Sequence, residues 1–134
     1  MAEPRRRSGL LSETVLRVLI DAGRPLSGTK LRELVREDGL SVQQSLIFRA
    51  IRQLIDRGTI RKIWAAGGYA PDGGGPTITL VCRECGDVAE IAHDETFVAL
   101  GRMAAAEGFA VSRPIVEICG VCTACSSLAV PETT

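Results

Sequence analysis

The sequence of 134 residues predicts an α+β protein made of two small domains. Apolar residues recur at helical spacing up to about residue 57, and strand-like runs follow residue 77. Between them lies Pro71-Asp72-Gly73-Gly74-Gly75-Pro76. Two prolines around a glycine triplet cannot form a helix or a central strand. Two Cys-x-x-Cys pairs occur only after this segment. We therefore predict domains at residues 1–70 and 77–134, joined by a linker at 71–76.

The composition excludes several classes of protein. With 46% apolar and 24% charged residues, the chain has the profile of a globular protein, and it contains no run of 18 uncharged apolar residues that spans a membrane. No apolar core follows the basic run Arg5-Arg6-Arg7, so we expect no secretory signal and a cytoplasmic location. The single histidine, His93, excludes a three-histidine zinc site and a two-cysteine, two-histidine finger.

The net charge of zero conceals two oppositely charged halves. Residues 1–64 contain thirteen basic and seven acidic side chains, a net charge of +6, while residues 65–134 have a net charge of −6. This distribution favours a polyanion-binding domain joined to an acidic partner-binding domain, although chance segregation of surface charge gives the same totals.

The basic half predicts three helices. We expect Ser12 to cap the first, which ends at Gly23, and the second to continue to Gly39. The third helix is predicted at 42–57, with Ser41 as its cap. One of its faces is apolar and consists of Ile47, Ile51, Leu54 and Ile55.

The opposite face of the third helix is typical of a recognition helix. Arginine pairs with guanine or phosphate, glutamine pairs with adenine, and an aromatic edge contacts a thymine methyl group. A solvated polar face, or a core position for Phe48, is the alternative. The predicted DNA-contacting residues on this face are Gln44, Ser45, Phe48, Arg49 and Arg52.

A β-hairpin is predicted after the third helix. The strand-like run 59–64 is followed by a glycine turn and by Tyr69. Three helices and a hairpin make a winged helix-turn-helix. We expect Lys62 and an N-terminal arm of Arg5, Arg6 and Arg7 to contact the phosphate backbone.

The acidic half predicts strands at 77–81, 88–91 and 110–119, and a helix at 94–107. Cys82 and Cys85 follow the first strand, and Cys122 and Cys125 follow the last. Four thiolates from two such turns bind one tetrahedral Zn²⁺, and this closed shell leaves no position for catalysis. We therefore predict one structural zinc ion per chain.

Three alternatives to zinc remain at this point. Disulfides are disfavoured in a chain without an export signal, and free core cysteines rarely form two such pairs. The additional Cys119 creates the spacing Cys119-x-x-Cys122-x-x-Cys125, which also occurs with iron–sulfur clusters. We expect Cys119 instead to be a packing residue at the end of a strand.

The sequence resembles the ferric uptake regulator (Fur) family of bacterial metal-responsive repressors. The segment 45–58 is similar to the family's recognition helix, with Phe48 at its usual tyrosine and Arg49 at its arginine. The segments Leu80-Val-Cys82-Arg-Glu-Cys85-Gly86 and Glu117-Ile-Cys-Gly120-Val-Cys122-Thr-Ala-Cys125 resemble its dimerisation domain. The resemblance implies a homodimer on double-stranded operator DNA. The fold is then an N-terminal winged helix-turn-helix followed by a small α/β dimerisation domain with a four-cysteine zinc site.

The sequence departs from the family where the family senses metal. The family's histidine-rich segment reads Pro76-Thr77-Ile78-Thr79 here, and a further family histidine falls at Pro114. Glu90 lies near a family ligand position and His93 follows it, but one histidine with scattered carboxylates makes a poor transition-metal site. We expect His93 to be a surface residue at the start of a helix.

The predicted function is that of a homodimeric DNA-binding regulator of the Fur family, a repressor, with structural zinc and no histidine-based sensing site. The alternative is a zinc-stabilised protein-interaction module or corepressor without operator recognition. An enzyme is not expected, because the sequence pairs no nucleophile with a base and has no phosphate-binding loop. The sequence leaves the operator and the inducing signal open.

Overall fold

The structure, a computed structural model, describes residues 4–126 and the side chains of residues 9–126. The chain divides into two compact units and passes from the first to the second between Gly74 and Gly75. No helix in the described part of the chain is both long and apolar enough to cross a lipid bilayer.

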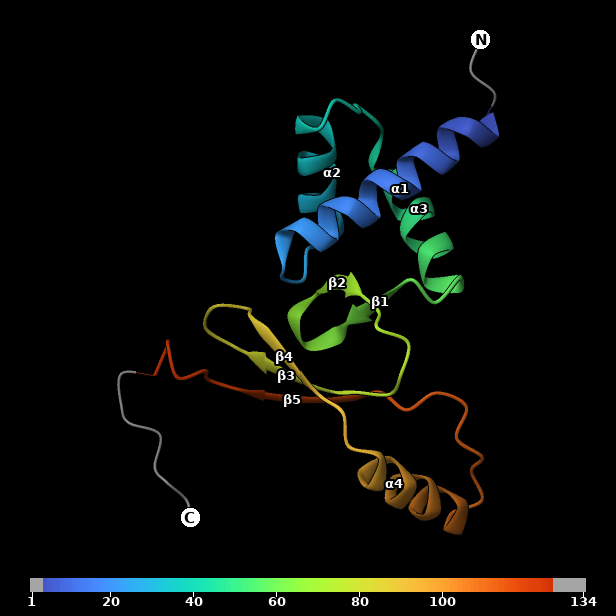
Figure 1. The fold of residues 1–134 in the computed structure, drawn as a ribbon, viewed down its shortest axis with the longest axis vertical. Helices are drawn as coiled ribbons and strands as arrows, with labels where there is room; N and C mark the ends of the chain where they lie inside the picture. The colour runs from blue at the N-terminus through green and yellow to red at the C-terminus, as the bar shows by residue number, and fades with distance from the viewer. Residues whose placement is uncertain (1–3, 127–134) are drawn as a thin grey trace. The chain divides into compact units, whose positions relative to one another are not determined.

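The first unit contains three helices and a hairpin, as expected for a winged helix (Figure 1). The helices are α1 (Pro4–Ala22), α2 (Gly28–Glu37) and α3 (Gln44–Asp56). Their apolar faces meet in one core, and burial of these side chains is the main force that holds the helices together. The buried core residues include Val15, Leu19, Leu31, Val35, Ile47, Ile51, Leu54 and Ile60.

The start of α1 differs from the prediction. Ser12 is not a cap, because the helix begins at Pro4 and Ser12 lies within it, buried, with Oγ 3.4 Å from the Gln53 Oε1 that accepts its hydrogen bond. Proline suits the first turn of a helix, and the buried Leu11 extends the apolar face upstream of Ser12. Arg5, Arg6 and Arg7 therefore lie in the first turns of α1 and not in an extended arm; their side chains are outside the described residues.

Helices α2 and α3 differ in how they begin. Ser27 caps α2, and its Oγ accepts a hydrogen bond from the backbone N–H of Lys30 at 3.1 Å. Ser41 does not cap α3, which starts at Gln44 and not at residue 42. Val42 remains in the connecting turn, because its carbonyl accepts a hydrogen bond from Nε of Arg32 at 3.0 Å.

The wing is an antiparallel hairpin of β1 (Ile60–Ile63) and β2 (Gly68–Pro71), joined by a short 3₁₀ turn at Trp64–Ala66. Gly67 ends this turn with φ +64°, a conformation that favours glycine. Backbone hydrogen bonds in both directions between Leu26 and Tyr69, at 3.0 and 2.8 Å, join the hairpin to the segment before α2. Pairing extends to Pro71, one residue into the predicted linker.

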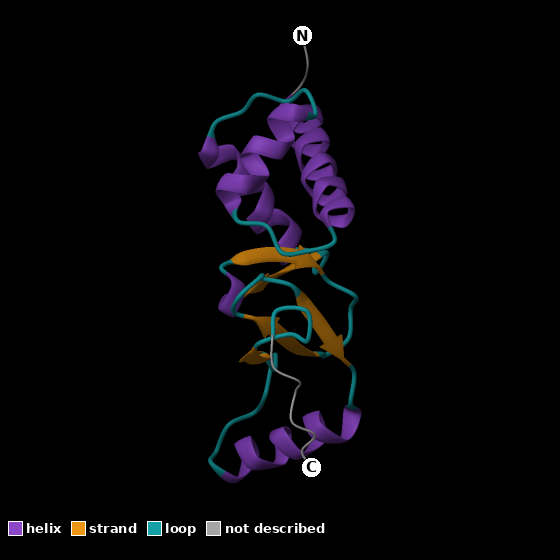
Figure 2. Ribbon diagram, turned by 90° about the vertical axis from the view of Figure 1, so that its left-hand side faces the viewer, coloured by secondary structure: helices purple, strands orange, loops and turns teal. Residues whose placement is uncertain are grey.

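The second unit contains a three-stranded sheet and one helix (Figures 1 and 2). The sheet order is β4-β3-β5, with β3 (Ile78–Cys82) antiparallel to β4 (Val88–Ile91) and parallel to β5 (Val116–Gly120). The crossover between β4 and β5 contains α4 (Asp94–Ala106), which has no buried residue. The predicted strand at 110–119 is too long: pairing with β3 starts only at Val116, two residues after Pro114.

Candidate metal centre and nucleic-acid interface

Four cysteines converge at one end of the three-stranded sheet. The Sγ atoms of Cys82, Cys85, Cys122 and Cys125 all lie within 4.8 Å of one another, and those of Cys85 and Cys122 are 3.8 Å apart. Four sulfurs around a tetrahedral Zn²⁺, at a Zn–S distance of about 2.3 Å, are separated by about 3.8 Å. The donor set and spacing fit a structural zinc site, and none of the five cysteines, all of them among the described residues, forms a disulfide.

The first Cys-x-x-Cys turn is shaped by the backbone at the end of β3. The N–H of Gly86 donates to the carbonyl of Cys82 at 3.0 Å, and the N–H of Cys82 donates to the carbonyl of Asp87 at 2.9 Å. Gly86 has φ +79°, which glycine adopts without strain. This tight turn places the sulfurs of Cys82 and Cys85 in the same cluster.

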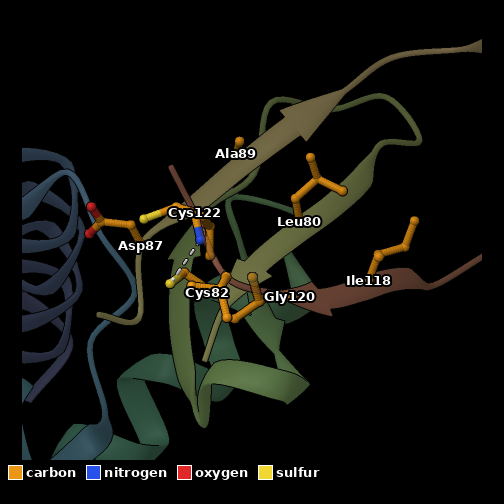
Figure 3. Close-up of a pocket in the computed structure, with 10 residues that line it drawn as sticks. Leu80, Cys82, Asp87, Ala89, Ile118, Gly120 and Cys122 are labelled. Atoms are coloured by element: carbon orange, nitrogen blue, oxygen red, sulfur yellow. Dashed lines mark hydrogen bonds between the residues drawn. The ribbon is translucent and has the colours of Figure 1, made fainter. Parts of the chain in front are cut away.

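The second turn is held against the first by the register of β3 and β5. Cys82 pairs with Gly120, and the N–H of Arg83 donates to the carbonyl of Gly120 at 2.8 Å. The chain then turns so that the N–H of Cys125 donates to the carbonyl of Cys122 at 3.1 Å. Figure 3 shows Cys82 and Cys122 beside Gly120, joined by the hydrogen bond from the N–H of Cys122 to Sγ of Cys82, whose length is 3.3 Å.

The four thiols are electrostatically unequal. The N–H groups of Cys122 and Cys85 stabilise the thiolate of Cys82 and lower its pKa to about 6. Hydrogen bonds with the sulfurs of Cys122 and Cys85, followed by burial, raise the pKa of Cys125 to about 12. The N–H of Asp87 lowers the pKa of Cys85, but burial and the sulfurs of Cys82 and Cys122 more than offset this, and the net shift is upward. One thiolate is therefore present before a metal arrives, while Cys85 and Cys125 retain their protons.

Cys119 does not belong to this cluster. It lies on β5, opposite Val81, and its side chain is exposed. The prediction of a packing residue is wrong, because β5 forms one edge of the sheet and nothing in the described unit covers this side chain.

His93 is exposed and caps α4. Its Nδ1 lies 2.8 Å from Oγ1 of Thr96 and 3.3 Å from the backbone N of Thr96. Glu90 is exposed on β4. Among residues 4–126, the four cysteines are the sole group of three or more potential metal ligands close enough to share an ion.

The exposed face of α3 presents most of the predicted DNA-contacting residues. Ser45, Arg49 and Arg52 are exposed, and Phe48 is 47% exposed. Gln44 is half-buried, and its Nε2 donates a hydrogen bond to the carbonyl of Gly28 at 2.8 Å. Gln44 therefore differs from the other predicted contacts: its side chain joins α3 to α2, whereas theirs are exposed to solvent.

On the wing, Lys62 lies over the ring of Trp64, with Nζ 4.0 Å from the ring centroid. Trp64 is 60% exposed and was not among the residues predicted to contact DNA. The sequence did contain a signal for Trp64, because it lies two residues after the predicted contact Lys62 and just before the glycine turn. The close approach of the Phe48 ring to Gly28 was not predicted either, because the two residues belong to different helices and no sequence pattern links them.

The chain shares its fold, a winged helix joined to a small α/β unit with four clustered cysteines, with solved structures of zinc and ferric uptake regulators. The chain is similar to the zinc uptake regulation protein of Escherichia coli K12, with 28% identity over 116 residues that cover 83% of this chain and 68% of the relative. The corresponding protein of Shigella flexneri matches equally well. No model of a known protein family matches the chain.

Solved structures show the same fold. A zinc uptake regulator complexed with zinc and DNA has a TM-score of 0.79 and 24% identity, covering 86% of this chain and 80% of that one. The holo form of the regulator XcZur has a TM-score of 0.76, also at 24% identity, and covers 86% and 83%. The ferric uptake regulator of Francisella tularensis with iron has a TM-score of 0.68 and 14% identity, covering 86% of this chain and 90% of that one.

Proposed function

We propose that this protein is a homodimeric transcriptional repressor that binds double-stranded DNA through α3 and contains one structural zinc ion per chain. The observation that carries the proposal is the two-sided character of α3. Ile47, Ile51 and Leu54 are buried in the core, whereas the opposite side exposes Ser45, Phe48, Arg49 and Arg52. A helix anchored in this way presents arginines in a fixed direction, as reading of the major groove requires.

Charge supports DNA as the ligand. Residues 1–64 have a net charge of +6, and this excess lies in the winged helix itself. Phosphate contacts by basic side chains supply most of the sequence-independent affinity for DNA, and base contacts by the recognition helix supply the specificity. Lys62, stacked on Trp64 in the wing, is a proposed phosphate contact.

The second unit is proposed to form the dimer. It exposes an unusual number of large apolar side chains, and α4 has no buried residue at all. Such extensive apolar exposure is typical of subunit interfaces, and a second copy of the chain presents the same surface. The exposed residues are Ile91, Val98, Met103, Phe109, Val111, Ile115, Ile118 and Val121.

The zinc ion is proposed to be structural and not regulatory. The four sulfurs complete its coordination, so no position remains for an exchangeable ligand. The single histidine is engaged as the cap of α4. We propose that the family's histidine-based sensing site is absent and that the protein is not an enzyme.

Selection from a pool of random DNA duplexes tests the proposal. The zinc-loaded protein is expected to enrich an inverted repeat, because a twofold dimer presents two α3 helices. Arg49→Ala is expected to weaken binding to the enriched duplex by at least about tenfold. Arg36→Ala is the control and should bind normally, because it removes the same side chain from the exposed last turn of α2, outside the proposed contacts. A pool without a shared motif, together with protein partners captured by the same protein, would favour the interaction module instead.

A further inference from the structure

Gly28 and Phe48 are in direct contact where α2 meets the exposed face of α3. Gly28 is the first residue of α2 and is buried. A methyl group at its Cβ position would lie 2.6 Å from both Cε1 and Cζ of Phe48. Carbon atoms in contact normally lie 3.5 to 4.0 Å apart, so the ring occupies the space that any other side chain at residue 28 would need.

The need for glycine here is spatial and not conformational. Gly28 is not among the glycines with positive φ. Its position within a helix makes glycine intrinsically less favourable than alanine. The contact with the Phe48 ring therefore explains why residue 28 is a glycine in this structure.

Gln44 supports the same contact from the preceding turn of α3. Its Nε2 donates a hydrogen bond to the carbonyl of Gly28 at 2.8 Å. Gln44 and Phe48 are four residues apart and so lie on the same side of the helix. The first residue of α2 thus receives one polar and one apolar contact from α3.

Phe48 is nevertheless 47% exposed. One edge of its ring lies against Gly28, while about half of the side chain remains open to solvent on a helix that also exposes Ser45 and Arg49. The contact with α2 fixes the direction in which the ring projects from the surface proposed to bind DNA.

We propose that Gly28 is a positioning residue for DNA recognition: by lacking a side chain, it holds the ring of Phe48 in the orientation that fits the operator. The inference rests on the proposed function. Alanine at residue 28 displaces the ring, which is the far end of a side chain and moves outward without disturbing the core. The expected consequence is impaired recognition in a protein that remains folded.

A double-mutant cycle tests this inference with the duplex enriched by the wild-type protein. Gly28→Ala is expected to weaken binding about tenfold, with an unchanged or higher melting temperature. Phe48→Leu removes the ring, so adding Gly28→Ala to it should change affinity by less than about twofold. Gly9→Ala is the matched control, because Gly9 is also helical and its Cβ position has no atom within 4 Å.

Two results would overturn the inference. The Gly28→Ala protein could bind DNA as tightly as the wild type, or Gly28→Ala could weaken DNA binding equally in the wild-type and Phe48→Leu backgrounds. A second readout does not depend on DNA. Nuclear Overhauser effects between the Hα protons of Gly28 and the ring protons of Phe48 are expected in the wild type and should weaken at residue 28 in Gly28→Ala, as the ring moves away by about 1 Å. If these signals are present but no duplex is enriched, the proposed function fails while the contact stands; if they are absent in the wild type, the inference itself fails.

Discussion

The backbone N–H of Cys122 donates a hydrogen bond to Sγ of Cys82 at 3.3 Å, and this contact joins the two Cys-x-x-Cys turns. This hydrogen bond is the largest cause of the lowered pKa of Cys82, which is about 6, whereas the pKa values of Cys85 and Cys125 are raised. The backbone of the sheet therefore prepares the site, and the ion then completes it.

Removal of zinc is expected to unfold the second unit and leave the first folded. In the described part of the second unit the buried residues are Thr79, Val81 and Cys82, whereas the first unit has an extensive apolar core. A four-thiolate zinc site contributes on the order of 10 kcal/mol to folding, more than this small core supplies. Hydrogen exchange after treatment with a chelator should show lost protection in β3, β4 and β5 only. Protection retained in β3 without zinc would show that the ion is dispensable.

Zinc affinity is expected to rise steeply with pH. The pKa values of Cys85 and Cys125 are raised in the metal-free fold, so both thiols hold protons at pH 7 that Zn²⁺ must displace. Release of at least these two protons increases affinity by at least about a hundredfold per pH unit. Below pH 6 Cys82 also becomes protonated, and the stabilisation of its thiolate by the N–H of Cys122 is lost. Calorimetric titration in buffers of different ionisation enthalpy counts the protons, and a pH-independent affinity would contradict the pKa pattern.

Cys119 is expected to react with iodoacetamide in the zinc-loaded chain while the other four cysteines are protected. It is exposed and lies outside the cluster, whereas bound Zn²⁺ blocks the ligand sulfurs. Mass spectrometry should find one modified cysteine with zinc bound and five after its removal under denaturing conditions. Protection of Cys119 in the dimer would place it within the subunit interface.

Ile118→Asp is expected to weaken the dimer, because it places a charge on the exposed apolar surface of the second unit. Ile118 is 52% exposed in the single chain, so the substitution costs little in folding. Ile20→Asp is the matched control: Ile20 is 58% exposed but lies on α1 of the first unit. Analytical ultracentrifugation should show monomers for the first variant and dimers for the second, and a dimeric Ile118→Asp protein would place the interface elsewhere.

Local periodicity was sufficient to predict the α+β fold and the winged helix. The apolar repeat of α3 identified Ile47, Ile51 and Leu54 as its inward face, and all three are buried. Cysteine spacing predicted four converging sulfurs without any knowledge of the sheet, because Cys-x-x-Cys turns have few geometries that suit a metal.

Features that depend on contacts between distant segments could not be predicted in this way. Serine is a common N-cap residue, but the apolar face of α1 extends upstream of Ser12 to Leu11, so the helix does not begin at Ser12. Gln44 has the chemistry of a base-reading residue, but it donates to the carbonyl of Gly28. Cys119 follows apolar residues in a strand, but that strand lies at the edge of the sheet.

X-ray absorption at the zinc edge, together with the metal content of the purified chain, tests the central claim most directly. One zinc ion per chain with four sulfur neighbours at about 2.3 Å is the predicted result, and added iron, manganese or zinc should leave both the spectrum and the stoichiometry unchanged. A shell that contains nitrogen or oxygen ligands, or a second tightly bound ion, would contradict a purely structural zinc site.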